Sequence, residues 1–126
     1  MTRILLVDDD KDVRDVLHSI LLSSGYDVVA VGNGEEAVQT FSGSQFDIVI
    51  TDIIMPVKDG LETISEILEI RPDTKIIAMS GGGRQGNVDF LETARALGAS
   101  LTFNKPFNLR ELIGGIEQLA GGPDAG

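Results

Sequence analysis

Five short runs of consecutive apolar residues recur along the chain, and the intervals between them are long enough for one helix each. Every residue in these runs is apolar or β-branched, which is typical of strands buried on both faces of a parallel sheet. They cover residues 4–7, 28–31, 48–50, 76–79 and 101–103. This pattern favours folds in which helices cover both faces of a parallel sheet.

Between these runs the apolar residues repeat with the period of a helix, so that each segment has one apolar face. The predicted inward-facing residues are Val13, Val16, Leu17, Ile20 and Leu21, then Ala37, Val38 and Phe41, then Leu61, Ile64, Ile67 and Leu68, then Val88, Leu91 and Ala94, and finally Leu109, Leu112, Ile113, Ile116 and Leu119. Gly25 and Gly98 indicate helix ends, and Asn108 is a predicted N-cap. Strand and helix alternate five times, which predicts an α/β fold with a doubly wound, five-stranded parallel sheet of the flavodoxin-like type.

The chain has 126 residues, of which 42% are apolar, and this suits one compact domain with a real core. We expect residues 1–120 to form that domain and residues 121–126, rich in Gly and Pro, to form a flexible tail. No stretch approaches the roughly 20 apolar residues of a membrane span, and the first apolar run is too short for a signal peptide. The absence of Cys is compatible with a reducing compartment, so a cytoplasmic protein with no membrane partner is expected.

The net charge is −10, from 10 basic and 20 acidic residues. Such a field repels a phosphate backbone, so direct nucleic-acid binding is not expected.

Polar side chains follow four of the five apolar runs. They are Asp8, Asp9 and Asp10 after the first run, Asp52 after the third, Ser80 after the fourth and Lys105 after the fifth. Ligand sites in open α/β sheets form outside the carboxyl ends of the strands, so these groups should converge. Clustered carboxylates repel one another unless a hard cation binds them, and oxygen ligands suit Mg²⁺. An anionic phosphoryl group could then approach, with a Lys and a hydroxyl to hold its oxygens.

The whole chain resembles the receiver domain of two-component response regulators. The resemblance rests on the acidic run 8–10, on residues 52–56 followed by Asp59 and Gly60, on residues 78–81, on Gly98 and on residues 105–107. It implies that Asp52 is the phosphoacceptor and that the metal is Mg²⁺. It also implies partners, namely a sensor histidine kinase or a histidine phosphotransfer protein, and an output domain or protein downstream.

The resemblance assigns further roles. Asp9 would bind the metal directly, Asp8 would support it, and the backbone carbonyl of Ile54 would be another ligand beside Asp52. Ser80 would hydrogen-bond a phosphoryl oxygen, and Lys105 would pair with the acids at rest and with the phosphoryl group afterwards. The Lys105–Pro106 peptide is expected to be cis. Such a protein is a switch that catalyses only its own phosphorylation and hydrolysis, so it is not expected to be an enzyme acting on a free metabolite.

Other interpretations are less well supported by the residues. Asp8 to Asp10 alone could be a solvated helix start, a part that Asp10 is expected to play. A phosphatase of the haloacid-dehalogenase type would place its nucleophile in an Asp-x-Asp-x-Thr pattern, but Asp12 occupies the Thr position. A phosphorylation-independent interaction module usually lacks an acid or the Lys, and both are present here. A flavodoxin-like electron carrier needs a loop rich in hydroxyls and Gly after the first strand, whereas this loop is acidic and would repel the flavin phosphate. His18 is expected to be a partly exposed helix residue without a catalytic role.

One position departs from the family. Thr102 stands where receivers commonly have Tyr or Phe, and Phe103 should point to the opposite face of its strand. Glycines are frequent in the segment that follows Ser80. Since Gly widens the accessible backbone range, we expect switching to occur mainly by rearrangement of residues 80–87 and the start of the next helix.

Overall fold

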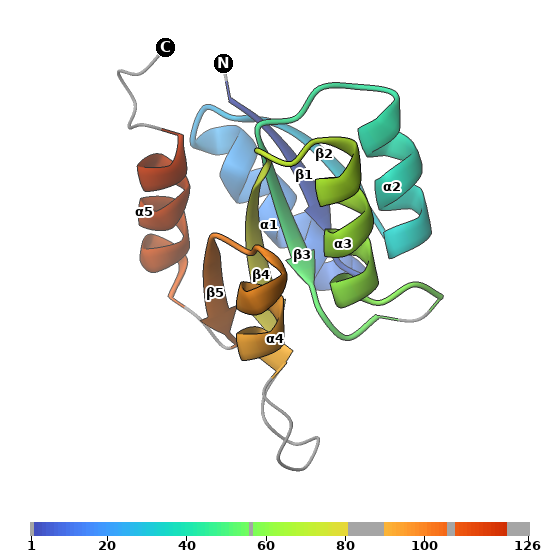
Figure 1. Cartoon of the computed structure of the whole chain (residues 1–126). Helices are drawn as coiled ribbons and strands as arrows, with labels where there is room; N and C mark the ends of the chain where they lie inside the picture. The colour runs from blue at the N-terminus through green and yellow to red at the C-terminus, as the bar shows by residue number, and fades with distance from the viewer. Residues whose placement is uncertain (1, 56, 81–89, 106–107, 121–126) are drawn as a thin grey trace.

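The computed structural model describes residues 2–55, 57–80, 90–105 and 108–120. Within them, strands and helices alternate five times, as the sequence predicts (Figure 1). The strands are β1 (Arg3–Val7), β2 (Asp27–Val31), β3 (Ile48–Asp52), β4 (Lys75–Ser80) and β5 (Leu101–Asn104). The helices are α1 (Lys11–Ser23), α2 (Gly34–Ser42), α3 (Gly60–Ile70), α4 (Phe90–Leu97) and α5 (Leu109–Leu119).

The strands form one parallel sheet in the order β2-β1-β3-β4-β5. In this order Leu6 pairs with Ala30 on one side and with Ile50 on the other. The chain therefore moves from β1 to one edge of the sheet and then returns to the other side of β1. The predicted doubly wound, flavodoxin-like α/β fold is confirmed, and such a reversal is where these folds place their ligand sites.

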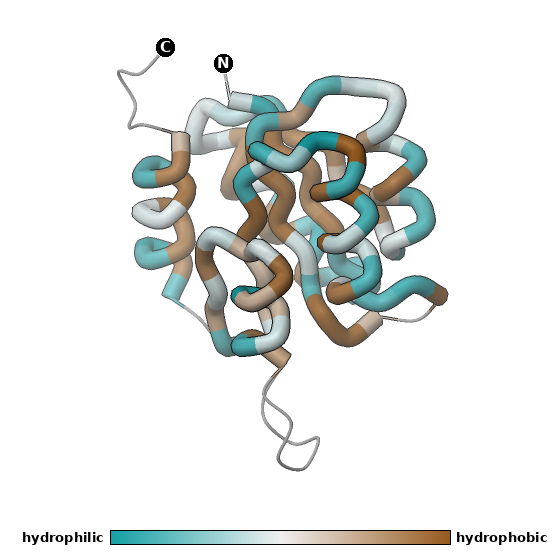
Figure 2. Tube along the Cα trace, viewed as in Figure 1, coloured by the Kyte–Doolittle hydropathy of each residue, from teal (hydrophilic) through white to brown (hydrophobic). Residues whose placement is uncertain are grey.

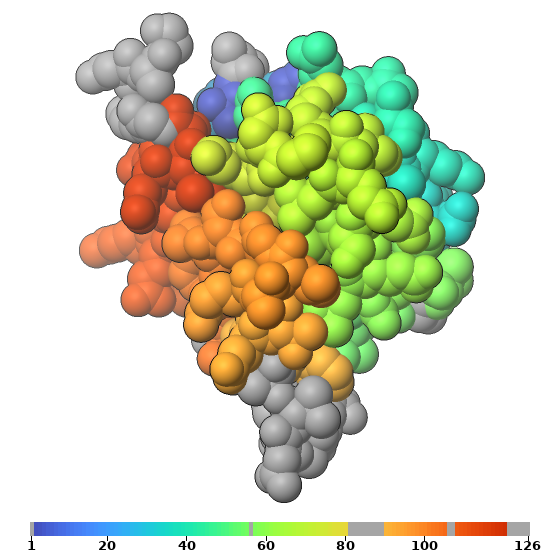
Figure 3. Space-filling view, viewed as in Figure 1, coloured from blue at the N-terminus to red at the C-terminus, as the bar shows by residue number. Residues whose placement is uncertain are grey.

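Two apolar clusters fill the space between the sheet and the helices on its two faces. One contains Ala37 and Phe41 of α2, Ile64 and Ile67 of α3, and Leu91 and Ala94 of α4. The other contains Leu17 and Leu21 of α1 and Leu112 and Ile116 of α5. The helices carry apolar residues toward the strands and polar residues outward (Figure 2), and in the space-filling view α3 and α4 cover much of the sheet (Figure 3).

Burial differs between the central and the edge strands. Every residue of β3 is buried, as are most of those in β1 and β4, whereas β2 and β5 are mostly half-buried. The prediction that all five runs are buried on both faces is therefore wrong for the two edge strands, which have a neighbour on one side only.

Two helix residues predicted to face inward are exposed. Val16 is 55% exposed and Leu109 is 40% exposed. Leu17 and Leu21 lie at the middle of the buried face of α1. Adjacent residues of a helix point about 100° apart, so Val16, next to Leu17, points outward. Leu109 is the first residue of α5, before that helix reaches the sheet, whereas Leu112 and Ile116 are fully buried.

Helix ends follow the predicted chemistry. Asn108 caps α5, and Gly25 and Gly98 take positive φ values of 97° and 126° just after α1 and α4. Several expectations lie outside the described residues: Val88 and the segment 81–89, the Lys105–Pro106 peptide, and the tail 121–126. None of the described helices combines the length and the apolar character that a membrane span requires.

Candidate metal and phosphoryl site

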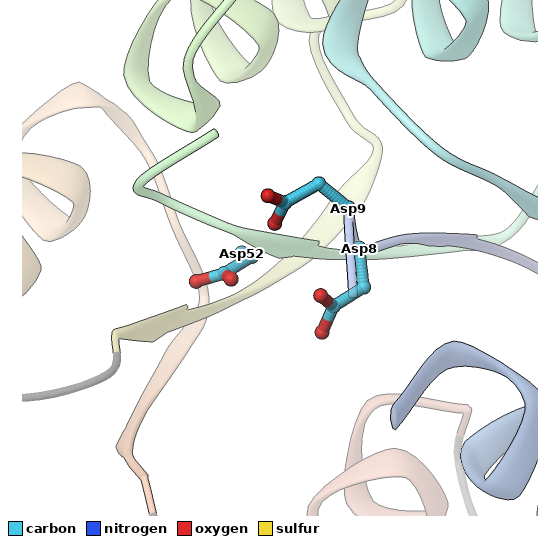
Figure 4. A group of neighbouring side chains, drawn as sticks. All are labelled: Asp8, Asp9 and Asp52. Atoms are coloured by element: carbon cyan, nitrogen blue, oxygen red, sulfur yellow. The ribbon is translucent and has the colours of Figure 1, made fainter. Parts of the chain in front are cut away.

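Three carboxylates meet at the carboxyl ends of two neighbouring central strands. Asp8 and Asp9 follow β1, Asp52 ends β3, and their oxygen atoms lie within 4.8 Å of one another (Figure 4). Asp8 and Asp52 are buried and Asp9 is exposed. The strands β3 and β4 run slightly beyond their apolar runs, so Asp52 and Ser80 are the last residues of these strands. The three carboxylates thus converge as the sequence predicts.

Lys105 contacts both buried acids from the end of β5. Its Nζ lies 3.1 Å from Asp8 Oδ2 and 3.2 Å from Asp52 Oδ2, and the Lys105 side chain is 21% exposed. The backbone N–H of Lys105 donates to the carbonyl of Ser80 at 2.7 Å. Ser80 is buried at the end of β4, so its backbone carbonyl fixes Lys105, whose ammonium group contacts the carboxylates.

The surroundings oppose the ionisation of Asp52. Burial raises the pKa of Asp52, Lys105 lowers it, and Asp8 raises it again, with a net increase over the ordinary value. Burial alone would lower the pKa of Lys105, but the charges of Asp52 and Asp8 raise it overall. Asp52 Oδ1 is buried and has no hydrogen-bond partner among the described residues. A buried acceptor without a partner is costly, and this one therefore points to a ligand.

Local hydrogen bonds fix the turn that carries Asp8 and Asp9. Asp8 Oδ1 accepts from the N–H of Asp10, and the Asp10 side chain accepts from the N–H groups of Asp12 and Val13 at the start of α1. Asp10 is therefore a helix cap, as predicted. Arg14 Nη1 donates to the Asp8 carbonyl at 2.8 Å. Sequence reasoning missed Arg14. The one signal for it in the sequence is its position one turn into α1, close to the acids that precede the helix.

The backbone of Gly60, at the start of α3, lies directly against the backbone of Asp52 and Ile53. The N–H of Gly60 donates to the Ile53 carbonyl at 2.7 Å. A Cβ atom on Gly60 would lie 2.2 Å from the Asp52 carbonyl oxygen and 2.6 Å from Ile53 Cα, which explains why Gly follows Asp59 here. Ile54, whose carbonyl is an expected metal ligand, lies in the loop between Asp52 and Gly60 and has an exposed side chain.

Thr102 and Phe103 lie on opposite faces of β5, as predicted. Thr102 Oγ1 accepts a hydrogen bond from Arg95 Nη2 of α4. Phe103 packs in the apolar cluster between the sheet and helices α1 and α5. Its ring lies close to Gly115 of α5, where an added Cβ atom would be 3.4 Å from Phe103 Cζ. His18 is half-buried on α1, away from the three carboxylates.

The donor set fits a magnesium ion. All the side-chain ligand atoms are carboxylate oxygens, two of the acids are buried, and Asp52 Oδ1 has no competing partner among the described residues. Hard divalent cations prefer such oxygen ligands, and the absence of sulfur and imidazole ligands from the cluster disfavours softer metals.

Comparison with known proteins agrees with this geometry. The sequence model of the response regulator receiver domain matches residues 4–117. The response regulator receiver protein CpdR of Brucella abortus is 36% identical over 94% of this chain and 97% of its own length. The transcriptional regulator NtrC of Azospirillum brasilense is 37% identical, but this chain spans only 23% of that protein.

Solved structures show the same likeness. The response regulator TrrA of Thermotoga maritima, in complex with Mg²⁺ and BeF, superimposes with a TM-score of 0.81 at 34% identity, over 94% of this chain and 99% of that one. The beryllofluoride-activated receiver domain of NtrC4 gives a TM-score of 0.84 at 30% identity, over 94% and 96%. The chain therefore belongs to the response regulator receiver domain family and is a receiver domain of two-component signalling.

Proposed function

We propose that Asp52 accepts a phosphoryl group from a phosphohistidine of a sensor kinase or phosphotransfer protein, or from a small phosphodonor. A carboxylate oxygen of Asp52 forms the new O–P bond as the P–N bond to the donor imidazole breaks, and the released imidazole takes a proton. The observation that carries this assignment is the buried Asp52 Oδ1, which has no partner among the described residues while Oδ2 holds Lys105.

Asp8, Asp9, Asp52 and the Ile54 carbonyl would hold Mg²⁺. When bound, the ion neutralises the carboxylates and stabilises charge that develops on the transferred phosphoryl group. The relative TrrA was solved with Mg²⁺ and BeF, which supports this choice of metal by analogy. In this chain the three acids leave more negative charge at the site than Lys105 can balance, because one ammonium group serves two of them.

Lys105 and Ser80 would hold the phosphoryl oxygens. Lys105 already reaches Asp52 and Asp8, so it can transfer its hydrogen bond to an oxygen attached at Asp52 without leaving the site. Ser80 ends the strand next to β3, where its hydroxyl can donate to another oxygen. Charge-assisted donors of this kind are stronger than neutral ones.

The proposed output is a conformational signal to another domain or protein, without turnover of a free metabolite. The position of Asp10 disfavours the dehalogenase-type alternative, in which two acids of the first loop act on the substrate. Asp10 Oδ1 instead accepts from the N–H groups of Asp12 and Val13 and caps α1.

Intact mass after treatment with acetyl phosphate and MgCl₂ tests this function. We expect one added phosphoryl group on the wild type and on a control variant, Asp73→Asn, which changes an exposed acid. We expect none on Asp52→Asn and none in excess chelator. A phosphorylated Asp52→Asn protein, or full modification without divalent metal, would contradict the proposal.

A further inference from the structure

Lys58 is an inward-turned cation on the loop between β3 and α3. Its Nζ pairs with Glu66 Oε2 of α3 and lies 3.8 Å from Glu35 Oε2 of α2, and the Lys58 side chain is only 14% exposed. The Lys58 ammonium donates a hydrogen bond to the Glu66 carboxylate, and this bond raises the pKa of Lys58 above its ordinary value. A surface lysine would keep its head in water, whereas the Lys58 ammonium lies against acids of α3 and α2. These two helices are neighbours in Figure 1.

The backbone of Lys58 is also held tightly. A Cβ atom on Gly34, the first residue of α2, would lie 2.5 Å from the Lys58 carbonyl oxygen and 3.1 Å from its Cβ. Lys58 therefore packs against α2 through its main chain and against α3 through its ammonium group. Displacing it would break both contacts.

The residue before it has a strained conformation that needs such support. Val57 has a φ of 70°, a value that is a genuine outlier for a β-branched residue, and its side chain is 81% exposed. Packing of the Val57 side chain therefore does not hold the turn. Strained conformations persist where contacts of the surrounding residues hold them in place, and Lys58, the next residue, makes such contacts with α3 and α2.

The turn is connected to the proposed metal site through the backbone. Gly60 donates to the Ile53 carbonyl, and its Cα lies against the Asp52 and Ile53 backbone with no room for a side chain. The loop that carries Ile54 is thus closed at its base next to Asp52. Its far side is fixed to α2 and α3 by Lys58.

We propose that Lys58 is a positioning residue for the metal: its ion pairs with Glu66 and Glu35 hold the turn at residues 57–59 against α2 and α3, and so place the Ile54 carbonyl beside Asp9 and Asp52. This inference rests on the proposed function, since it assigns a support to the same site. Second-sphere residues that orient ligands typically change metal affinity when they are removed.

The sign of the effect distinguishes positioning from long-range electrostatics. Removing a cation makes the site more negative, which by itself attracts Mg²⁺ more strongly. Loss of positioning weakens Mg²⁺ binding instead. Lys58→Met keeps most of the packing of the stem and removes the charge, while Lys58→Met with Glu66→Gln removes the ion pair and leaves the net charge unchanged. Lys75→Met is the matched control, since Lys75 is exposed at the opposite end of β4.

Calorimetric titration with MgCl₂, on proteins shown to be folded, tests the proposal. We expect a dissociation constant about tenfold higher for Lys58→Met and for the double variant, and an unchanged or slightly lower one for Lys75→Met. Hydrogen exchange at the Gly60 N–H should become faster in both Lys58 variants. If Lys58→Met does not fold, the double variant, which leaves no unpaired Glu66, still decides the question.

Two failures can be told apart. If the wild type binds Mg²⁺ and the double variant binds it with wild-type affinity, Lys58 does not position the site and this inference is wrong. A Lys58→Met protein that binds Mg²⁺ more tightly leads to the same conclusion, because only the loss of charge then matters. If the wild type itself binds no Mg²⁺, the proposed function fails, and this inference fails with it.

Discussion

Lys105 Nζ lies 3.2 Å from Asp52 Oδ2, and the same atom lies 3.1 Å from Asp8 Oδ2, so one ammonium group serves two buried carboxylates. One positive charge cannot balance these two acids together with Asp9. The site without metal therefore keeps a net negative charge within the protein. This imbalance underlies the first three predictions below.

Magnesium should stabilise the fold, because a ligand that binds only the native state raises the free energy of unfolding. At about ten times its dissociation constant the gain is about 1.4 kcal/mol. Asp9→Asn should raise the melting temperature of the metal-free protein by a few degrees, since it reduces repulsion, and it should weaken Mg²⁺ binding. Thermal unfolding with and without MgCl₂ measures both effects. An unchanged melting temperature at millimolar Mg²⁺ would count against a metal site here.

Stability of the metal-free protein should depend on pH through Asp52. The pKa of Asp52 is raised in the folded protein, so above that pKa the ionised form opposes folding, and stability increases as the pH falls through the raised pKa toward the ordinary value near 4. Urea unfolding from neutral pH down toward the ordinary carboxyl pKa near 4 should show this gain in the wild type and lack it in Asp52→Asn. Equal slopes for the two proteins would show that Asp52 does not titrate as described.

Lys105→Ala should give a folded protein that accepts some phosphate but does not relay the signal. Without metal, it should be less stable by about 1–3 kcal/mol, since Asp8 and Asp52 lose their shared cation. Magnesium should restore more stability to this variant than to the wild type, because the ion replaces the missing charge. Chemical unfolding, intact mass and a kinase-coupled output assay measure the three effects, with Lys75→Ala as the control. Normal signalling by Lys105→Ala would contradict the assigned role.

Two glycine substitutions should have opposite effects. Gly60→Ala places a Cβ atom 2.2 Å from the Asp52 carbonyl oxygen, so we expect a loss of about 3 kcal/mol or more and weaker Mg²⁺ binding. In Gly114→Ala, on the exposed face of α5, the new Cβ meets nothing within 4 Å, and we expect a gain of about 0.5–1 kcal/mol. Urea denaturation of both variants decides this. If Gly60→Ala is as stable as the wild type, the backbone of Gly60 can move away from Asp52 and Ile53 without lowering the free energy of unfolding.

Val57→Gly should stabilise the protein by up to about 1 kcal/mol, because Gly adopts the φ of 70° without strain and an exposed Val side chain loses little packing. The same substitution at Val16, which is exposed on α1, should be destabilising, since Gly is a poorer helix former. Destabilisation at both positions would indicate that the turn is not strained.

Local signals in the sequence predicted the sheet and the meeting of Lys105 with the site acids. Asp8, Asp52, Ser80 and Lys105 each follow an apolar run, and a parallel sheet gathers the carboxyl ends of its strands at one edge, so their convergence needed no further information. The exposure of the edge strands needed the strand order, which the runs do not contain. Conformational switching in residues 80–87 and the start of the next helix remains a prediction, since residues 81–89 lie outside the described residues.

The residues that were missed depend on how separate elements pack. Lys58 and Glu66 are eight positions apart, on a loop and a helix, and Glu35 belongs to another helix, so no helical or strand period relates them. Arg14 reaches the Asp8 carbonyl only because α1 turns back over the end of β1. The left-handed Val57 could not be predicted either, because its residue type disfavours that conformation.

The hydrogen bond from the Lys105 backbone to the Ser80 carbonyl has a mechanical consequence. This bond joins the main chains of the two residues proposed to hold the phosphoryl oxygens. We therefore expect a backbone shift at one of these residues to move the backbone of the other. The sheet resists such a shift unequally, because β4 is flanked on both sides whereas β5 ends the sheet. We therefore expect β5 to yield more easily than β4 when groups at the site move, and β5 also carries Thr102, which accepts a hydrogen bond from Arg95 of α4.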